Sequence, residues 1–197
     1  QCAATARLAR ILAGCNTTKD KMTTGSIPVA LNKPVETMND QEVRSATDRV
    51  GQAYEKNPRD PVNGVNYANL LRMQGRDAQA LAVMQQVAIA NPQDRNVLAA
   101  YGKAQAAAGQ LQQALDTIGR AQTADRPDWK LVSAQGAILD QLGRSSEARQ
   151  RYRDALDLQP GERSILSNLG MSYVLTRDLR TAETYLRQAA SQPTADS

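Results

Sequence analysis

The stretch ANLLRMQGRDAQALAVMQQVAIANP, residues 68–92, decides the fold. It reads as the end of one helix, a turn at Gly75, and a second helix whose apolar residues recur at three- and four-residue spacing. Asn91 and Pro92 end the second helix, because proline cannot continue a helix and disfavours helical backbone in the residue before it. The stretch therefore predicts a helix–turn–helix unit, with the carboxylate of Asp77 capping its second helix.

The same arrangement recurs along the chain with a period of 34 residues. Three columns of small or apolar residues on the second helices are Ala46, Ala80, Ala114, Ala148 and Ala182; Val50, Met84, Ile118, Tyr152 and Leu186; and Ala53, Val87, Ala121, Ala155 and Ala189. A column on the first helices is Ala68, Gly102, Gly136 and Gly170. The turn column is Gly75, Gly109 and Gly143, followed by Arg177 in the last unit. A period of this length predicts an array of helical hairpins that bury their apolar faces against one another.

The glycines of the first-helix column need a physical reason, because a glycine inside a helix costs about 1 kcal/mol relative to alanine. Gly102, Gly136 and Gly170 fall beside the alanine column of the second helix in the same unit. We expect the two helices to cross at this point, with their backbones too close for a larger side chain. The abundance of alanine, 31 residues in all, agrees with closely packed helices.

This pattern is that of tetratricopeptide repeats (TPRs). We expect an all-α, right-handed TPR solenoid over residues 39–197, made of one half repeat and four 34-residue repeats. The half repeat would span 39–60, and the repeats 61–94, 95–128, 129–162 and 163–196. Its first helices would line a concave surface.

The residues before the repeats resemble a bacterial lipoprotein leader. Leu12-Ala13-Gly14-Cys15 matches a lipobox, in which the cysteine becomes the lipidated first residue after cleavage. We therefore expect a signal segment at 1–14, lipidation at Cys15 and a flexible polar tether over 15–38. Arg7 and Arg10 interrupt the apolar run that such a signal needs, so a disordered leader with two incidental thiols is the alternative.

Composition excludes several classes of chemistry. The 197 residues include no histidine, and the two cysteines, Cys2 and Cys15, lie in the first fifteen. Ser-His-Asp and Cys-His catalysis is thus excluded, as is a Cys-based zinc or iron–sulfur site inside the repeats. The 24 Lys and Arg are well mixed with 20 Asp and Glu, a net charge of +4, whereas nucleic-acid binders usually carry a basic stripe or a larger excess. We expect no enzyme, metal, cofactor or nucleic-acid partner.

Within the TPR class, two segments resemble the TadD family of Flp/Tad pilus assembly lipoproteins. They are Leu166-Ser167-Asn168-Leu169-Gly170-Met171-Ser172-Tyr173, followed by Asp178-Leu179 and Ala182-Glu183, and Ser133-Ala134-Gln135-Gly136, followed by Asp140-Gln141-Leu142-Gly143. The resemblance implies an outer-membrane lipoprotein that faces the periplasm and is held to the membrane by its lipid alone. It also implies a pilotin-like or scaffold role, with the pilus secretin or other assembly components as partners.

The concave surface is the expected binding site. Its predicted residues are Asn66, Asn69, Arg72, Met73, Asn96, Lys103, Lys130, Ser133, Asp140, Ser167, Asn168 and Met171. Asparagine side chains can hydrogen-bond the backbone of an extended peptide, and the alanines between them, such as Ala99 and Ala137, leave room for it. A clamp for a terminal carboxylate is excluded, because Val65 and Ala134 stand where basic residues would be needed.

Three alternatives stay open. The predicted groove residues could be hydrated helix faces without a ligand. The protein could be a cytoplasmic TPR adaptor or co-chaperone that binds peptide tails, in which case it would fractionate as a soluble protein and carry no lipid on Cys15. A weaker third alternative is an enzyme whose catalytic part lies beyond residue 197.

Overall fold

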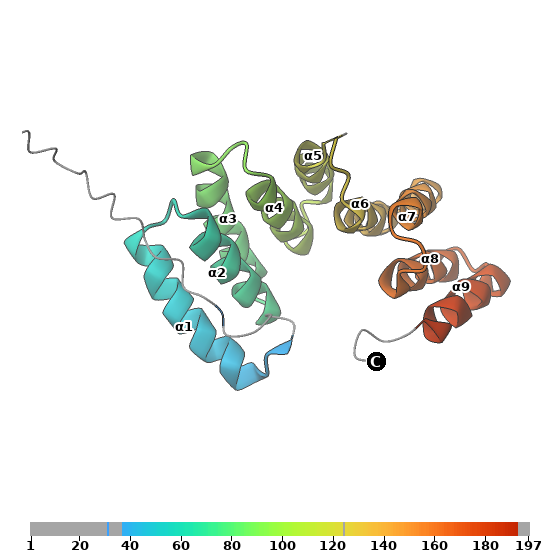
Figure 1. Cartoon of the computed structure of the whole chain (residues 1–197), viewed down its shortest axis with the longest axis horizontal. Coiled ribbons are helices and arrows are strands. Elements are labelled where there is room, and N and C mark those ends of the chain that lie inside the picture. Colours follow the sequence, from blue (N-terminus) through green and yellow to red (C-terminus); the bar gives the residue numbers. More distant parts are fainter. Residues whose placement is uncertain (1–30, 32–36, 124, 193–197) are drawn as a thin grey trace, which may run out of the picture.

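The computed structural model describes residues 31, 37–123 and 125–192, and within these ranges the chain forms nine α-helices and no sheet (Figure 1). The helices are α1 Asp40–Lys56, α2 Pro61–Met73, α3 Asp77–Ala90, α4 Arg95–Ala107, α5 Leu111–Ala121, α6 Trp129–Gln141, α7 Ser145–Leu158, α8 Arg163–Leu175 and α9 Leu179–Ser191. The expected all-α fold is confirmed. The predicted signal segment, Cys15 and most of the tether lie outside the described residues.

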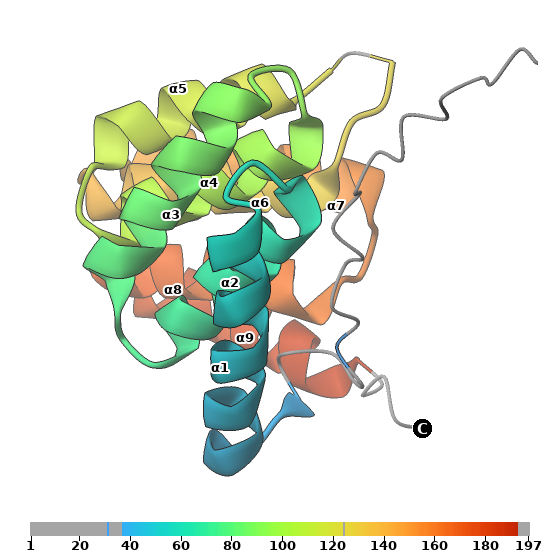
Figure 2. The same cartoon turned by 90° about the vertical axis from the view of Figure 1, so that its left-hand side faces the viewer.

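The helices form a curved array of hairpins. Each first helix (α2, α4, α6, α8) packs against the second helix of its own unit and against the second helix before it. Successive first helices also contact one another, whereas no comparable packing joins successive second helices of the described chain. Figure 1 shows the resulting arc, which runs from α1 at one end to α9 at the other, and Figure 2 views the same array from the side of α1. The first helices therefore lie on the inner side of the curve. None of the nine helices is long and apolar enough to span a membrane.

The start of each first helix is fixed by an acidic cap. The side chains of Asp60, Asp94, Asp128 and Glu162 accept hydrogen bonds from backbone N–H groups of the first turn, at 2.7–3.2 Å. A cap of this kind typically stabilises a helix by about 1 kcal/mol. These four residues are spaced 34 positions apart, so the repeat period also predicts where the caps lie.

The predicted cap of α3 by Asp77 is wrong. Arg76 occupies the N-cap position, makes no side-chain cap, and Asp77 is the first helical residue. Gln110 and Arg144 stand at the same point before α5 and α7 and also make no side-chain cap. Among α3, α5, α7 and α9, only α9 has a side-chain cap: Asp178 accepts from the N–H of Thr181 at 3.2 Å.

The predicted close approach at the glycine column is confirmed. A Cβ added at Gly102 would lie 2.4 Å from Cγ1 of Ile118, and one at Gly136 would lie 2.6 Å from Cε1 of Tyr152. One added at Gly170 would lie 2.8 Å from Cδ2 of Leu186. These distances are shorter than side-chain carbons tolerate, so the glycines are required by the packing of the two helices in each unit.

The N-terminal end of the array is closed by residues outside the helices. Val43, Ala46 and Val50 of α1 form a buried cluster with Leu70 of α2, and Leu31 and Met38 pack against it. The sequence pattern of α1 is that of a second helix, and no first helix precedes it among the described residues. Leu31 and Met38 therefore cover part of the apolar face of α1 that a first helix covers in the other units. The arrangement of α1 followed by four hairpins is consistent with the expected half repeat and four repeats.

The turn before each second helix uses left-handed backbone. Gly75, Gly109 and Gly143 have φ of +69°, +80° and +74°, and Arg177, in the same column, has φ +62°. Among the described residues Arg177 is the only non-glycine with positive φ. A side chain in this conformation costs roughly 1–2 kcal/mol, so the last turn carries a local strain that the first three turns lack.

We expect Arg177→Gly to stabilise the protein by about 0.5–1 kcal/mol, because relief of the strain outweighs the greater entropy of glycine in the unfolded chain. Thermal unfolding followed by circular dichroism should show a Tm about 1–4 °C higher. The reverse change at the matching position, Gly143→Arg, should lower Tm. An added Cβ would meet no atom within 4 Å, so the cost comes from the backbone φ of +74° alone. A lower Tm for Arg177→Gly would contradict this reading of the turn.

Candidate protein-binding groove

All twelve predicted groove residues lie on the first helices, whose inner surface we call the groove. Asn66, Asn69, Arg72 and Met73 are on α2; Asn96 and Lys103 on α4; Lys130, Ser133 and Asp140 on α6; Ser167, Asn168 and Met171 on α8. Their exposure differs. Met73 and Met171 are 46% and 51% exposed, Asn96 and Lys130 are exposed, and the others except Ser133 are half-buried. Whether they bind a ligand stays a prediction.

Ser133 and Asn168 join two successive first helices. Ser133 is only 6% exposed, and its hydroxyl accepts a hydrogen bond from Nδ2 of Asn168 at 3.4 Å. Asn168 is half-buried and lies nearer to solvent. The structure thus places Ser133 in the contact between α6 and α8, and leaves Asn168 as the member of the pair that a peptide could reach.

Asp140 is the centre of a hydrogen-bonded cluster that joins three helices. Its Oδ1 accepts from the hydroxyl of Ser172 on α8 at 2.8 Å, and its Oδ2 accepts from the hydroxyl of Tyr152 on α7 at 3.2 Å. Burial, aided by the nearby carboxylate charge, raises the pKa of the Tyr152 phenol above its ordinary value, so Tyr152 stays protonated and donates. The Asp140 carboxylate is thus already bound within the fold.

The cluster was not foreseen from the sequence. The residues that match Asp140 in the other three units are Arg72, Ala106 and Val174, so the 34-residue period carries no signal for it. The 34-residue period likewise did not predict the stack formed by Arg149, Tyr173 and Tyr185. The guanidinium carbon of Arg149 lies 4.6 Å from the centroid of the Tyr173 ring, which stacks on Tyr185 at 5.7 Å. Both groups tie the last two units together.

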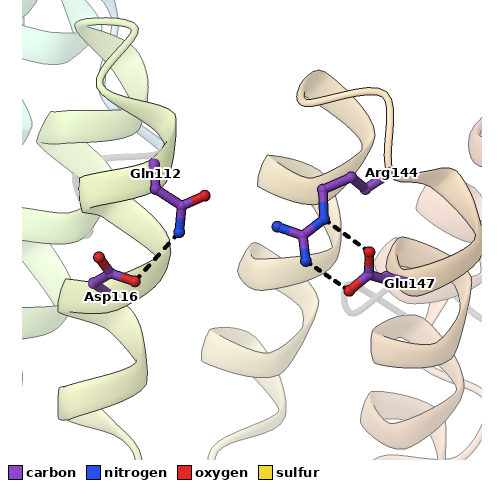
Figure 3. A network of polar contacts seen from close by, with 4 residues as sticks. All are labelled: Gln112, Asp116, Arg144 and Glu147. Atoms are coloured by element: carbon purple, nitrogen blue, oxygen red, sulfur yellow. Dashed lines mark hydrogen bonds and ion pairs between the residues drawn. The ribbon is translucent and has the colours of Figure 1, made fainter.

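The second helices present a different surface, shown in Figure 3. Arg144, directly before α7, donates to both carboxylate oxygens of Glu147 at 2.8 and 2.7 Å. Within α5, Gln112 donates to Asp116 at 3.4 Å. The hydrogen bond from Arg144 holds the pKa of Glu147 below its ordinary value. The pair is exposed to solvent, so it contributes little to stability. Arg151–Asp154 and Arg187–Glu183 are further ion pairs on the second helices.

Two observations concern metal binding and hollows in the described part of the chain. Within it, no three or more Asp, Glu, His or Cys gather to hold a metal ion. A hollow between the α1–α2 turn and the end of α3 is lined by Asn57, Pro58, Arg59, Gln86, Ile89 and Ala90. It combines amide and aliphatic groups with one arginine and offers no general acid–base pair.

Comparison with known proteins bears on the fold. No protein-family model matches the chain, and no curated protein matches it in sequence. Among solved structures, a thermophilic TPR protein of Thermus thermophilus is similar with a TM-score of 0.69 and 22% identity, over 79% of this chain and 86% of that one. PilF of Pseudomonas aeruginosa has a TM-score of 0.64 and 14% identity, over 78% of this chain and 70% of that one. MamA has a TM-score of 0.62 and 15% identity, over 76% of this chain and 88% of that one. These likenesses establish the fold.

Proposed function

Since the chain folds as a TPR solenoid, we propose that it is a non-enzymatic scaffold whose groove binds a segment of a partner protein. The observation that carries this proposal is the continuous inner surface made by α2, α4, α6 and α8, which contact one another in succession. Exposed or half-buried asparagines, such as Asn66, Asn69 and Asn96, can pair with the backbone of an extended segment. Repeat arrays use such concave surfaces for binding.

We further propose that the protein is a lipid-anchored, periplasm-facing component of the outer membrane that assists Flp/Tad pilus assembly in a pilotin-like role. The support is the resemblance of Leu166–Tyr173 and the segments after it to the TadD family, together with the lipobox that ends at Cys15. The fold shared with PilF is compatible with this role. The proposed partners are the pilus secretin and its assembly components.

Capture from detergent-solubilised cell envelope tests this role. A tagged protein should recover the pilus secretin or another assembly component, identified by mass spectrometry, and a deletion strain should have fewer pili. An untagged strain and a tagged, unrelated outer-membrane lipoprotein serve as controls. Normal piliation in the deletion strain, with no pilus component recovered, would overturn the pilus role.

The anchor predicts a change of location in one variant. Cys15→Ala should move the protein from the membrane fraction to the soluble fraction, because the thioether-linked lipid supplies the membrane affinity. Cys2→Ala should leave the fractionation unchanged, since Cys2 would be removed with the leader. Intact mass of the membrane-extracted protein should show cleavage before Cys15 and the added lipid. Equal membrane recovery of wild type and Cys15→Ala would rule out the anchor.

A cytoplasmic adaptor that binds peptide tails is the second candidate, favoured by Arg7 and Arg10 in the leader. It predicts recovery in the soluble fraction and an unmodified Cys15. The fractionation experiment therefore separates the two locations, while both keep the groove as the binding site.

A further inference from the structure

A hollow of about 700 Å³ lies outside the groove, between the α1–α2 turn and the end of α3. It has two walls, which are formed by Asn57, Pro58 and Arg59 of the turn and by Gln86, Ile89 and Ala90 of α3. The side-chain amide of Asn91, directly after α3, donates to the carbonyl of Arg59 at 2.9 Å. This hydrogen bond ties the turn to the end of α3 and so fixes one wall against the other.

The polar side chains of the hollow offer free donors, while their oxygens are already engaged. Oδ1 of Asn57 accepts from the backbone N–H of Arg59 at 3.4 Å, and Oε1 of Gln86 accepts from the hydroxyl of Tyr54 at 3.1 Å. Burial raises the pKa of Tyr54, so its hydroxyl stays protonated and donates. Nδ2 of Asn57, Nε2 of Gln86 and the guanidinium of Arg59 are left as donors without a partner in the described chain. Among the residues that line the hollow, Arg59 alone is charged.

Ile89 gives the hollow an apolar surface that the repeat pattern does not require. This side chain is 81% exposed, and its column carries Thr123, Asp157 and Ser191 in the other units. Pro58 on the opposite wall is exposed as well. Carbon surface therefore stands on both sides of the free donors.

The next unit fills the corresponding place with a side chain of its own. Arg120 stands at the position of Gln86, and its guanidinium donates at 3.4 Å to the carbonyl of Pro92, which is the counterpart of Pro58. Gln86 bonds Tyr54 instead and makes no such bridge to the turn. The open hollow is thus a feature of the first unit and not of the repeat.

We propose that this hollow is a second docking surface, which binds a partner segment with an acidic side chain between aliphatic ones. A carboxylate can accept from all three free donors and offset the charge of Arg59. The apolar groups on both walls suit aliphatic neighbours on both sides of the carboxylate, which a residue within a segment has and a chain end lacks. A surface outside the groove allows the scaffold to hold two partners at once.

The ends of two helices favour a polypeptide over a small free anion. The hollow lies at the C-terminal ends of α1 and α3, where partial negative charge opposes an anion by itself. The last carbonyls of a helix lack partners within the helix, and the backbone N–H groups of a polypeptide can donate to them. An acidic residue inside a segment brings both the carboxylate and these N–H groups.

An NMR titration of the full chain, labelled with nitrogen-15, tests the proposal. The probe is a short end-capped peptide with one glutamate between two leucines, and matched peptides replace the glutamate by glutamine or the leucines by serine. The amide signals of Arg59, Gln86 and Ile89 should shift with the probe, which should bind at least about tenfold more tightly than either matched peptide. Added salt should weaken the complex.

Three outcomes of the titration would contradict the proposal. They are no shift of these signals at about 1 mM probe, equal binding of the glutamine peptide, and tighter binding of a peptide without glutamate that ends in a free leucine carboxylate. The last outcome would assign the hollow to a chain end.

Gln86→Glu tests the donor set at a single atom. The new carboxylate can still accept from the hydroxyl of Tyr54, but it replaces the Nε2 donor by a charged oxygen. Binding of the probe should therefore fall by at least about tenfold. Unchanged binding would show that the amide donor takes no part and would overturn the proposed recognition.

Matched variants locate the site. Arg59→Gln and Ile89→Gln should each weaken the probe about tenfold, because they remove the charge and the apolar contact. Arg180→Gln and Leu179→Gln remove the same groups from exposed positions on α9 and should change binding less than twofold. Circular dichroism checks that each variant folds. Equal losses in the α9 variants would mean a general surface effect and overturn the site.

A blocked groove separates this inference from the proposed function. Ala137→Trp places a bulky side chain on α6, away from the hollow, so the probe should bind this variant as it binds wild type. Loss of probe binding in Ala137→Trp would place the peptide in the groove and overturn the second surface, while groove binding would stand.

Discussion

Gly136→Leu is expected to lower the free energy of unfolding by about 2–3 kcal/mol and Tm by roughly 5–10 °C. The first added carbon alone would lie 2.6 Å from Cε1 of Tyr152 and 2.9 Å from two other ring atoms. Tyr152 is 2% exposed and held by Asp140, so its ring cannot move aside without breaking that hydrogen bond. Overpacking and the lost hydrogen bond outweigh the roughly 1 kcal/mol by which leucine favours a helix over glycine.

Gly119→Leu is the matched control. Gly119 is also helical, in α5, but it is exposed, and an added Cβ would meet only Nε2 of Gln135 at 3.9 Å. The same substitution should therefore leave stability unchanged or raise it by up to about 1 kcal/mol. Thermal and chemical unfolding measure both variants. A Tm of Gly136→Leu within a degree of wild type would contradict the close crossing of α6 and α7.

The fold was predictable because the period repeats each packing requirement. The column of Gly102, Gly136 and Gly170 indicated the helix crossing, and the spacing of Gly75, Gly109 and Gly143 indicated the turns. The last member of that turn column shows what the period cannot supply: Arg177 breaks the pattern in sequence and yet adopts the same backbone conformation, φ +62°. Packing of α8 and α9 imposes the turn whatever residue stands there.

The candidate site was predictable only to the level of helix and face. The period places every predicted residue on a first helix, but it does not say which polar groups the fold itself uses. Ser133 is buried in the contact with Asn168, and Asp140 binds Tyr152 and Ser172. The paired residues are 12–35 positions apart in the sequence. Each of these hydrogen bonds occurs once and is not repeated in the other units, so the 34-residue pattern does not predict them.

A bulky residue in the groove is expected to have the larger effect on function. Ala137 is half-buried on α6, and its column carries Asn69, Lys103 and Met171 in the other units. Large side chains are thus accommodated at this point of the repeat, so Ala137→Trp should fold. The indole would occupy the middle of the groove, and we expect capture of the partner to fall by at least about tenfold. Capture from envelope extract, quantified by mass spectrometry, measures this.

Ala82→Trp provides the control on the opposite side of the array. Ala82 is exposed on α3, and its column carries Asp116, Gln150 and Thr184, so a large side chain is tolerated there too. The variant should capture the partner within twofold of wild type. A loss as large as that of Ala137→Trp would show that either substitution disturbs binding indirectly.

The same two positions provide the most direct test of the central claim, that partners bind on the first helices. A photo-crosslinking amino acid is placed at Ala137 in one variant and at Ala82 in the other, in cells that express the native partner. The account predicts a covalent adduct from Ala137 and none from Ala82. An adduct from Ala82 with none from Ala137 would place the partner on the second helices and contradict it.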